Sequence, residues 1–266
     1  MNRIVTLLLI IFLTSIYCYS QSDTIFNQTD KNGLKQGFWK KSYPNGKVAY
    51  QGFFKDDKPR GTFKRYHENG IAKAILSWND KGDYASVCFY YNTGKLAVEG
   101  FYSNTQKDSL WKYYSPNKAL VFEESYLDGK KHGTYKSYYQ DGKVYETISW
   151  KNGKKNGLLI QYYQNGLYKA SAKYIDDVQD GSIRVYYFNG KMQVDGNYKN
   201  GLKHGKWKFY DENGMLVRET NFINGQPENY QEELLRENQK IDEMLKNVGR
   251  IPEPSIDDFL KKMGGY

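Results

Sequence analysis

The sequence predicts a mostly β protein, an elongated antiparallel meander of eight 24-residue β-hairpin repeats with a short C-terminal α-helical segment. Three observations predict this fold. A small residue recurs every 24 positions, a turn signal follows nine positions later, and aromatic residues occupy fixed places in every unit. An unbroken period of this length is typical of repeat proteins, in which each unit packs against its neighbours alone.

The first twenty residues have the features of a secretory signal. Arg3 supplies a positive charge, residues 4–16 form an apolar run, and small residues precede a cleavage point at Gln21. The run is shorter than the roughly 20 residues that span a bilayer. We therefore expect removal of residues 1–20 and export to the periplasm, the cell envelope or the medium of a bacterium. A retained membrane anchor and a lipid on Cys18 are the alternatives.

The composition of the full sequence suits a protein with much surface and little deep core. Only 39% of the residues are apolar, while 26% are charged and 17% aromatic. No long apolar segment follows residue 20, so no transmembrane segment is expected in the mature chain. Cleavage leaves Cys88 as the only cysteine, which excludes an intramolecular disulfide and a Cys-rich zinc site.

Residues 21–31 are expected to be a linker, and residues 32–226 the repeat domain. The eight units begin at small residues: Gly37, Gly61, Ala85, Ser109, Gly133, Gly157, Gly181 and Gly205.

A glycine nine residues after the start of a unit marks its first turn, and Lys118 takes this place in the fourth unit. Asn-Gly and Asp-Gly tolerate the positive φ angles of a type I′ turn, so we expect that turn here. We expect a positive φ at Gly166 but none at Lys118. A second turn signal closes each unit, as at Asn152-Gly153 and, in weaker form, at Asp176-Asp177. Two turns in 24 residues leave two strands of about seven residues each.

Two aromatic columns support the hairpin register, because side chains at equivalent places stack between successive hairpins and contribute roughly 0.2–1 kcal/mol per pair. One lies five residues after the start of seven units, with Ser42 in the first: Tyr66, Tyr90, Tyr114, Tyr138, Tyr162, Tyr186 and Tyr210. The other lies seventeen residues after the start: Phe54, Trp78, Tyr102, Tyr126, Trp150, Tyr174, Tyr198 and Phe222. The abundance of tyrosine is thus explained by packing.

Residues 200–214, NGLKHGKWKFYDENG, carry most clearly a pattern that resembles the MORN repeat in its bacterial variant, found in YwqK-family antitoxin components of toxin–antitoxin systems. The resemblance covers about residues 32–225 and implies a scaffold for contact with proteins or membranes, or an antitoxin role. Units three and four depart from the pattern at Ala85, Val87, Ser109 and Lys118. We expect a bulge or a specialised surface there.

The residues offer no catalytic constellation, cofactor motif or metal-ligand set. His132 and His204 occupy a permissive position three units apart, too far apart to share a metal ion. His67 takes a place that is tyrosine in most other units. Glu123 and Glu124 are neighbours on one predicted strand and should point to opposite faces, which argues against an acid/base pair.

A basic column three residues after the start of six units is the main candidate site. These side chains form a candidate binding stripe for an anionic partner, such as lipid headgroups, surface polysaccharide or an acidic protein. The alternative is a solvated face that keeps the sheet soluble. Nucleic acid is not expected as a partner of an exported chain. The stripe consists of Lys40, Lys64, Lys112, Lys136, Arg184 and Lys208.

Residues 227–266 are expected to be a helical cap or tail. Asn229 and Glu232 resemble a capping box, and an apolar stripe continues to Val248, before Gly249 and Pro252. A second short helix is expected from Ser255. The apolar stripe of this helix should cover the last hairpin or bind a partner.

We expect a non-enzymatic exported repeat scaffold that binds a protein or an anionic envelope component through an extended Tyr/Lys-rich sheet, with peripheral membrane contact as one form of this binding. An antitoxin or immunity-like protein that neutralises a toxin is the alternative, and an envelope hydrolase is a third. No cofactor is expected.

Overall fold

The computed structural model describes residues 25–247. The predicted signal peptide and the predicted second helix from Ser255 therefore lie outside the described residues. Within them, no helix is both long and apolar enough to cross a bilayer.

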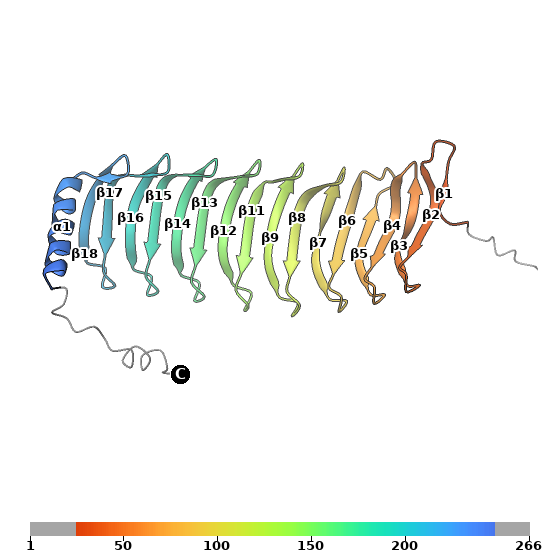
Figure 1. Cartoon of the computed structure of the whole chain (residues 1–266), viewed down its shortest axis with the longest axis horizontal. Helices are drawn as coiled ribbons and strands as arrows, with labels where there is room; N and C mark the ends of the chain where they lie inside the picture. Colours follow the sequence, from red (N-terminus) through yellow and green to blue (C-terminus); the bar gives the residue numbers. More distant parts are fainter. Residues whose placement is uncertain (1–24, 248–266) are drawn as a thin grey trace, which may run out of the picture.

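The described chain forms one open antiparallel sheet of nineteen strands, followed by a helix. Successive strands pair along the chain, except that the short β10 and the following β11 both pair with β9 and not with each other. The hairpins stand side by side in a long row with α1 at one end (Figure 1). The predicted meander is confirmed.

Most strands are seven to nine residues long, as the spacing of the turn signals predicted. Their bounds are β1 Gln28–Thr29, β2 Lys35–Ser42, β3 Val48–Lys55, β4 Lys58–Tyr66, β5 Ala72–Trp78, β6 Tyr84–Tyr90, β7 Leu96–Ser103, β8 Gln106–Tyr114, β9 Leu120–Leu127, β10 Lys130–Lys131, β11 Gly133–Tyr138, β12 Val144–Lys151, β13 Lys154–Tyr162, β14 Tyr168–Ile175, β15 Val178–Tyr186, β16 Met192–Lys199, β17 Leu202–Tyr210, β18 Leu216–Ile223 and β19 Gln226–Pro227.

The first turn of each unit differs from the predicted type. At β2–β3 the amide of Gly46 donates to the carbonyl of Tyr43, and only Gly46 has a positive φ. This is the pattern of a type I turn followed by one left-handed residue, so the predicted type I′ turn is wrong here. Lys118 has φ 67° at the equivalent place. The expectation that Lys118 needs no positive φ is therefore also wrong, because the turn requires it whatever the residue.

The type I′ geometry instead occurs at the second turn of every unit except the second, where only Gly82 has a positive φ in the loop between β5 and β6. Asn152 and Gly153 have φ values of 52° and 84°, and Asp176 and Asp177 have 49° and 72°. Two consecutive residues with positive φ match the twist of the strands on either side. The aspartate pairs thus form the same turn as Asn-Gly.

The small residues at the unit starts lie at β-bulges. Gly61 has φ 56°, and the register of β3 with β4 shifts beside it. Between β5 and β6 the register runs without a shift, and Ala85 lies opposite Trp78 with none of its surface exposed. The bulge expected as a departure in the third unit is therefore wrong, because Ala85 removes the bulge that other units have.

The core is one side chain thick and lies on one face of the sheet. Trp111 is 1% exposed, and its ring covers Gly100, where a Cβ atom would lie 2.3 Å from the ring. Gly196 beneath Trp207 repeats this arrangement. Glycine therefore allows a tryptophan of the next hairpin to pack flat on the strand.

Helix α1, Tyr230–Asn247, begins directly after Asn229, as the capping signal predicted. It lies beside β18 at the end of the row (Figure 1). Leu234 is 38% exposed and Ile241 52% exposed. The helix thus leaves much of its predicted apolar stripe open.

Candidate functional site: the two faces of the sheet

The two faces of the sheet carry different chemistry, because successive side chains of a strand point to opposite sides. We call the face that contains Trp39, Trp111, Glu124 and Trp207 the aromatic face. We call the face that carries the predicted binding stripe the charged face. The stripe residues follow the tryptophans by one position, so they lie on the opposite side of the sheet.

The structure places the six stripe residues in line on the charged face, but it also brings carboxylates between them. Lys112 Nζ lies 3.7 Å from Glu99, Lys136 Nζ lies 3.4 Å from Glu123, and Arg184 Nε lies 3.4 Å from Asp195. Lys208 lies opposite both Asp195 and Glu219 in the strand register. The middle and the C-terminal end of the stripe are therefore partly neutralised.

The N-terminal end of the stripe has a different setting. Lys40 lies opposite Gln51, and Lys64 lies between Gln51 and Ile75. Neither lysine has an ion pair among the described residues. Their positive charge is therefore available to solvent or to a partner.

The tyrosines five residues after the unit starts share the charged face. Tyr114 donates a hydrogen bond of 2.7 Å to Glu99. Burial, followed by this carboxylate, raises the pKa of Tyr114 to about 12. Burial and the carboxylate of Glu123 likewise raise the pKa of Tyr138 to about 12. These tyrosines stay protonated at neutral pH and act as hydrogen-bond donors.

A shallow hollow of about 280 Å³ interrupts the stripe between β6, β7 and β8. Cys88, Glu99, Leu110 and Lys112 are among the residues that line it. Cys88 takes the place of a stripe residue, and this substitution removes a long basic side chain from the line. The hollow therefore lies where Cys88 interrupts the basic column.

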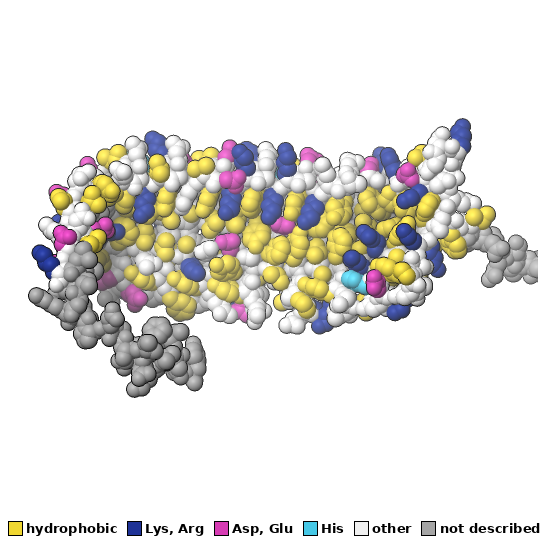
Figure 2. Space-filling model, viewed as in Figure 1, with side chains coloured by type: hydrophobic (Ala, Val, Ile, Leu, Met, Phe, Trp, Pro, Cys, Tyr) yellow, Lys and Arg dark blue, Asp and Glu magenta, His cyan; other side chains and the backbone are white. Residues whose placement is uncertain are grey.

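A second lysine column, which was not predicted from the sequence, lies on the aromatic face. Lys203 Nζ lies 4.7 Å from the ring centre of Trp207 and 4.9 Å from that of Phe222. Figure 2 shows a continuous band of hydrophobic side chains along the molecule, with single basic side chains beside it at intervals. The signal in the sequence is a lysine two residues before the unit start. The column consists of Lys35, Lys107, Lys131, Lys155 and Lys203.

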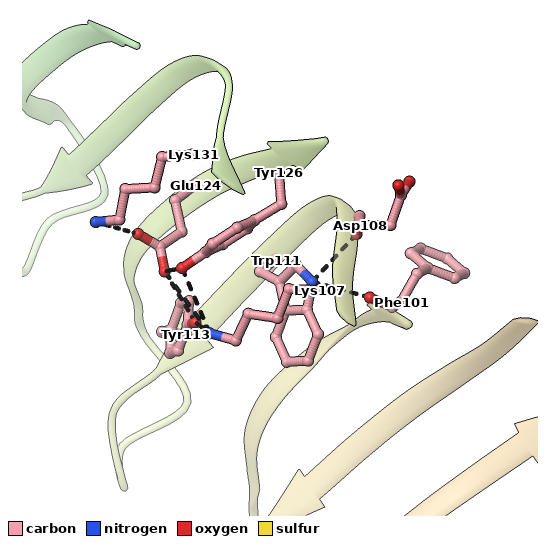
Figure 3. Close-up of polar contacts among 8 residues, drawn as sticks. All are labelled: Phe101, Lys107, Asp108, Trp111, Tyr113, Glu124, Tyr126 and Lys131. Atoms are coloured by element: carbon pink, nitrogen blue, oxygen red, sulfur yellow. Dashed lines mark hydrogen bonds and ion pairs between the residues drawn. The ribbon is translucent and has the colours of Figure 1, made fainter. Parts of the chain in front are cut away.

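A buried carboxylate lies in the middle of the aromatic face (Figure 3). Glu124 is 6% exposed and accepts hydrogen bonds from Tyr126 at 2.6 Å and from Tyr113 at 3.0 Å. Lys131 Nζ lies 2.8 Å from its other oxygen, and Lys107 Nζ lies 4.0 Å away. A buried charge needs such partners, because its desolvation is costly.

The partners decide the charge state of this cluster. Burial alone would raise the pKa of Glu124, but hydrogen bonds from Lys131, Tyr126 and Tyr113 lower the pKa overall. Burial lowers the pKa of Lys107, and the nearby charge of Glu124 opposes this effect. The cluster therefore holds an ionised carboxylate at neutral pH.

Glu124 was not predicted as a site residue, although the repeat pattern carries a signal for it. The equivalent position in the other seven units is small, apolar or threonine, so one charged residue there is exceptional. The predicted divergence of Glu123 and Glu124 is confirmed, since Glu123 pairs with Lys136 on the opposite face. The equivalents of Glu124 are Gly52, Leu76, Gly100, Ile148, Ala172, Gly196 and Thr220.

The three histidines lie apart from one another. His67 Nε2 is 3.0 Å from the carbonyl oxygen of Tyr90, in a place where other units use a tyrosine hydroxyl. His132 and His204 lie beside the bulges of different hairpins. Across residues 25–247, no group of three or more histidine, cysteine or carboxylate side chains could hold a metal ion.

The fold and its two faces define an open-sheet β-hairpin repeat protein. Five segments match the family described as MORN repeat variant: residues 35–56, 86–104, 131–152, 179–200 and 203–224. The chain therefore carries MORN repeats of the variant type, and this part of the predicted resemblance is confirmed.

The comparisons with curated proteins and with solved structures give no information about the function of this chain. No curated protein matches the chain. Similar solved structures include TarM, with 12% identity over 35% of this chain and 20% of that one, at a TM-score of 0.27. A mutant of S. aureus TarM in complex with Fondaparinux, alpha-GlcNAc-glycerol and UDP is 11% identical over 36% of this chain and 19% of that one. Its TM-score is 0.28. TcdB2-TccC3 is 9% identical over 73% of this chain and 13% of that one, with a TM-score of 0.19. This chain spans a fifth or less of each, and the low scores support no functional argument.

Proposed function

We propose that this protein is an exported, non-enzymatic repeat scaffold that binds an anionic partner, either a component of the cell envelope or an acidic protein. The observation that carries the proposal is the lysine column on the aromatic face. Lys35, Lys155 and Lys203 lie over aromatic rings and have no ion pair among the described residues. Their charge is thus held in place without being neutralised.

The spacing of the column suits an extended partner. Two strands advance the sheet by about 10 Å, so equivalent lysines repeat at about that distance or its multiples. Each exposed charge contributes little by itself, and several contacts act together along one partner. Aromatic rings beside the lysines add contact area that is insensitive to salt.

The charged face is the weaker candidate within this proposal. Carboxylates lie next to Lys112, Lys136 and Arg184, so the predicted stripe presents free charge mainly at Lys40 and Lys64. The antitoxin role remains an inference from family resemblance alone. Export remains a prediction of the first twenty residues.

Two double variants compare the faces directly. The probe is a vesicle that contains phosphatidylglycerol, measured by cosedimentation at low and at physiological salt. We expect Lys155→Glu with Lys203→Glu to weaken binding about tenfold, and Lys40→Glu with Lys64→Glu to weaken it less. Binding of the parent should fall with salt, because charges are screened over about 8 Å at physiological ionic strength.

Neutral vesicles of phosphatidylcholine are the matched control for the probe. Unchanged binding in both double variants, together with no response to salt, would rule out an electrostatic scaffold. A larger loss from the Lys40 and Lys64 pair would move the site to the charged face, as the sequence first indicated.

A further inference from the structure

The first turns of successive hairpins are joined by a ladder of side-chain hydrogen bonds. Tyr43 donates its hydroxyl to the carbonyl of Tyr66 at 2.7 Å, and Tyr163 donates to the carbonyl of Tyr186 at 2.8 Å. His67 takes the same place toward Tyr90. Such bonds occur at six junctions, each spanning 23 residues. We call this set the turn ladder: Tyr43, His67, Tyr91, Tyr139, Tyr163 and Tyr187.

The turn ladder is interrupted once between the first and the last hairpin, at Ser115. A serine side chain is too short to reach the carbonyl of Tyr138, which is the equivalent acceptor in the next hairpin. The backbone of this turn nevertheless keeps the geometry of the others, since Lys118 N donates to Ser115 O at 2.8 Å. The amide of Ser115 donates to Ala119 O at 2.9 Å, as in the equivalent turns. The missing part is therefore a side chain and not a turn.

A hollow of about 480 Å³ lies where that side chain would be. We call it the turn hollow, and its walls come from the turns and strand ends of the fourth and fifth units. Val121 is 40% exposed and supplies an apolar wall. The volume falls in the range of about 300–1,000 Å³ that small-molecule sites occupy. The residues that line it include Ser115, Asn117, Leu120, Val121, Tyr138 and Tyr139.

We propose that the turn hollow binds the phenol group of a tyrosine side chain presented by a partner protein. The molecule itself supplies the template for this occupant, because five other junctions hold a phenol in the equivalent place with its hydroxyl on a carbonyl. The partner's hydroxyl donates to the carbonyl of Tyr138, and its ring packs beside Leu120 and Val121. An incoming tyrosine thus completes the turn ladder from outside.

The hydroxyl should give a measurable preference over phenylalanine. A single neutral hydrogen bond contributes about 0.5–1.5 kcal/mol net, which corresponds to a preference of about fivefold. Binding in the turn hollow does not involve the side chains of the lysine columns. Changes at Lys155 and Lys203 should therefore leave this binding unchanged, and failure of one proposal does not imply failure of the other.

The test uses the peptide acetyl-Gly-Tyr-Gly-amide, its phenylalanine twin and p-cresol, titrated into the protein with methyl groups observed by NMR. We expect the tyrosine peptide to shift the methyl signals of Leu120 and Val121 and to bind about fivefold more tightly than the phenylalanine peptide. If p-cresol saturates the site while the tyrosine peptide does not bind, the occupant is a free phenol, and the partner proposal is overturned.

Two variants make the test specific. Ser115→Tyr fills the turn hollow from within and should abolish peptide binding while raising the midpoint of urea denaturation. Ser77→Tyr places a tyrosine at an exposed strand position and should change neither. Peptide binding that survives in Ser115→Tyr, or equal affinity for the two peptides, would overturn the proposal.

A third variant tests the template itself. Tyr163→Ser removes a member of the turn ladder and should open a second hollow, so that binding of the tyrosine peptide rises toward two molecules per chain. If Tyr163→Ser remains folded by circular dichroism and still binds a single peptide, the template argument is wrong.

Discussion

The regular hairpins from β13 to β18 and the central hairpins from β8 to β11 follow the same 24-residue plan, but different side chains hold them together. The regular hairpins use small or apolar residues such as Ala172 and Gly196 beneath the next hairpin, and tyrosines join their turns. The central hairpins use the Glu124 cluster and lack one bond of the turn ladder.

This difference teaches that the backbone of the array tolerates an exchange of apolar packing for a buried ionic cluster. Register and turn geometry are the same on both sides of the exchange. Polar and charged groups that could bind a partner occur in the central hairpins, where they replace the regular apolar packing. The central hairpins are therefore the place to look for specificity, and the regular hairpins the place to look for stability.

The largest expected effect comes from Glu124→Gln. This change removes the carboxylate that Lys131, Tyr113 and Tyr126 share, and several hydrogen bonds to a charged group, at about 1.5–3 kcal/mol each, make the loss about 3 kcal/mol. Urea denaturation followed by tryptophan fluorescence measures it. The exposed ion pair of Lys206 and Glu219 provides the control, since Glu219→Gln should cost less than about 1 kcal/mol.

The same variant predicts a change in pH dependence. The pKa of Glu124 is lower in the folded protein than its ordinary value, so its contribution is present above that value and lost as the pH falls through the folded pKa. The stability of the parent should therefore decline below about pH 5, and that of Glu124→Gln should decline less. If the free energy of unfolding falls equally steeply with pH in the parent and in Glu124→Gln, ionisation of Glu124 does not contribute to stability.

Gly196→Ala should have the next largest effect. The added Cβ would lie 2.4 Å from the ring of Trp207, and overpacking of this kind costs about 2 kcal/mol. Gly100→Ala beneath Trp111 should cost a similar amount, although it lies beside the central hairpins. A much smaller loss at Gly100 would show that the central hairpins have room to adjust.

Tyr163→Phe tests one bond of the turn ladder in the regular hairpins. It removes the hydrogen bond to the carbonyl of Tyr186 and should cost about 1 kcal/mol. Hydrogen exchange should quicken in the two turns that this bond joins. If the midpoint of denaturation does not move, solvent replaces the hydroxyl, and the ladder contributes order rather than stability.

Lys118→Gly should give the smallest effect and the opposite sign. Lys118 has φ 67°, a conformation that glycine adopts without a steric penalty, while glycine loses more chain entropy on folding. We expect a net gain of about 0.5 kcal/mol. Gly166→Lys, at the equivalent turn of the sixth unit with φ 89°, should produce a comparable loss. Effects of the same sign at the two turns would contradict this view of the left-handed position.

Periodicity in the sequence predicted the meander, the number of hairpins and the strand lengths, because a 24-residue repeat with two turn signals allows few other arrangements. The assignment of the turn types failed, since Asn-Gly suits both a type I′ turn and a type I turn with a left-handed glycine. Strand length and the position of the bulge choose between them, and neither is written in the dipeptide.

The candidate sites could be predicted only in part, because their properties depend on residues that lie in neighbouring strands. The stripe from Lys40 to Lys208 was found because its members share one position, but its neutralisation depends on partners such as Glu99, which lie in the neighbouring strand. Glu124 and Ser115 carry no motif of their own, and each is recognisable only as the exception in a column of equivalent positions.

The turn ladder also determines how the length of this protein can change. Every bond in it reaches the hairpin that comes next in the chain, 23 residues ahead. An in-frame duplication of residues 157–180 would supply Tyr163 with an acceptor in its own copy and leave the hairpins on either side with their usual neighbours. Each added copy would lengthen the row by about 10 Å. Evolution can therefore adjust the reach of this sheet along a partner by copying whole hairpins, because the new junction keeps the bond of the turn ladder and the flanking junctions keep their contacts.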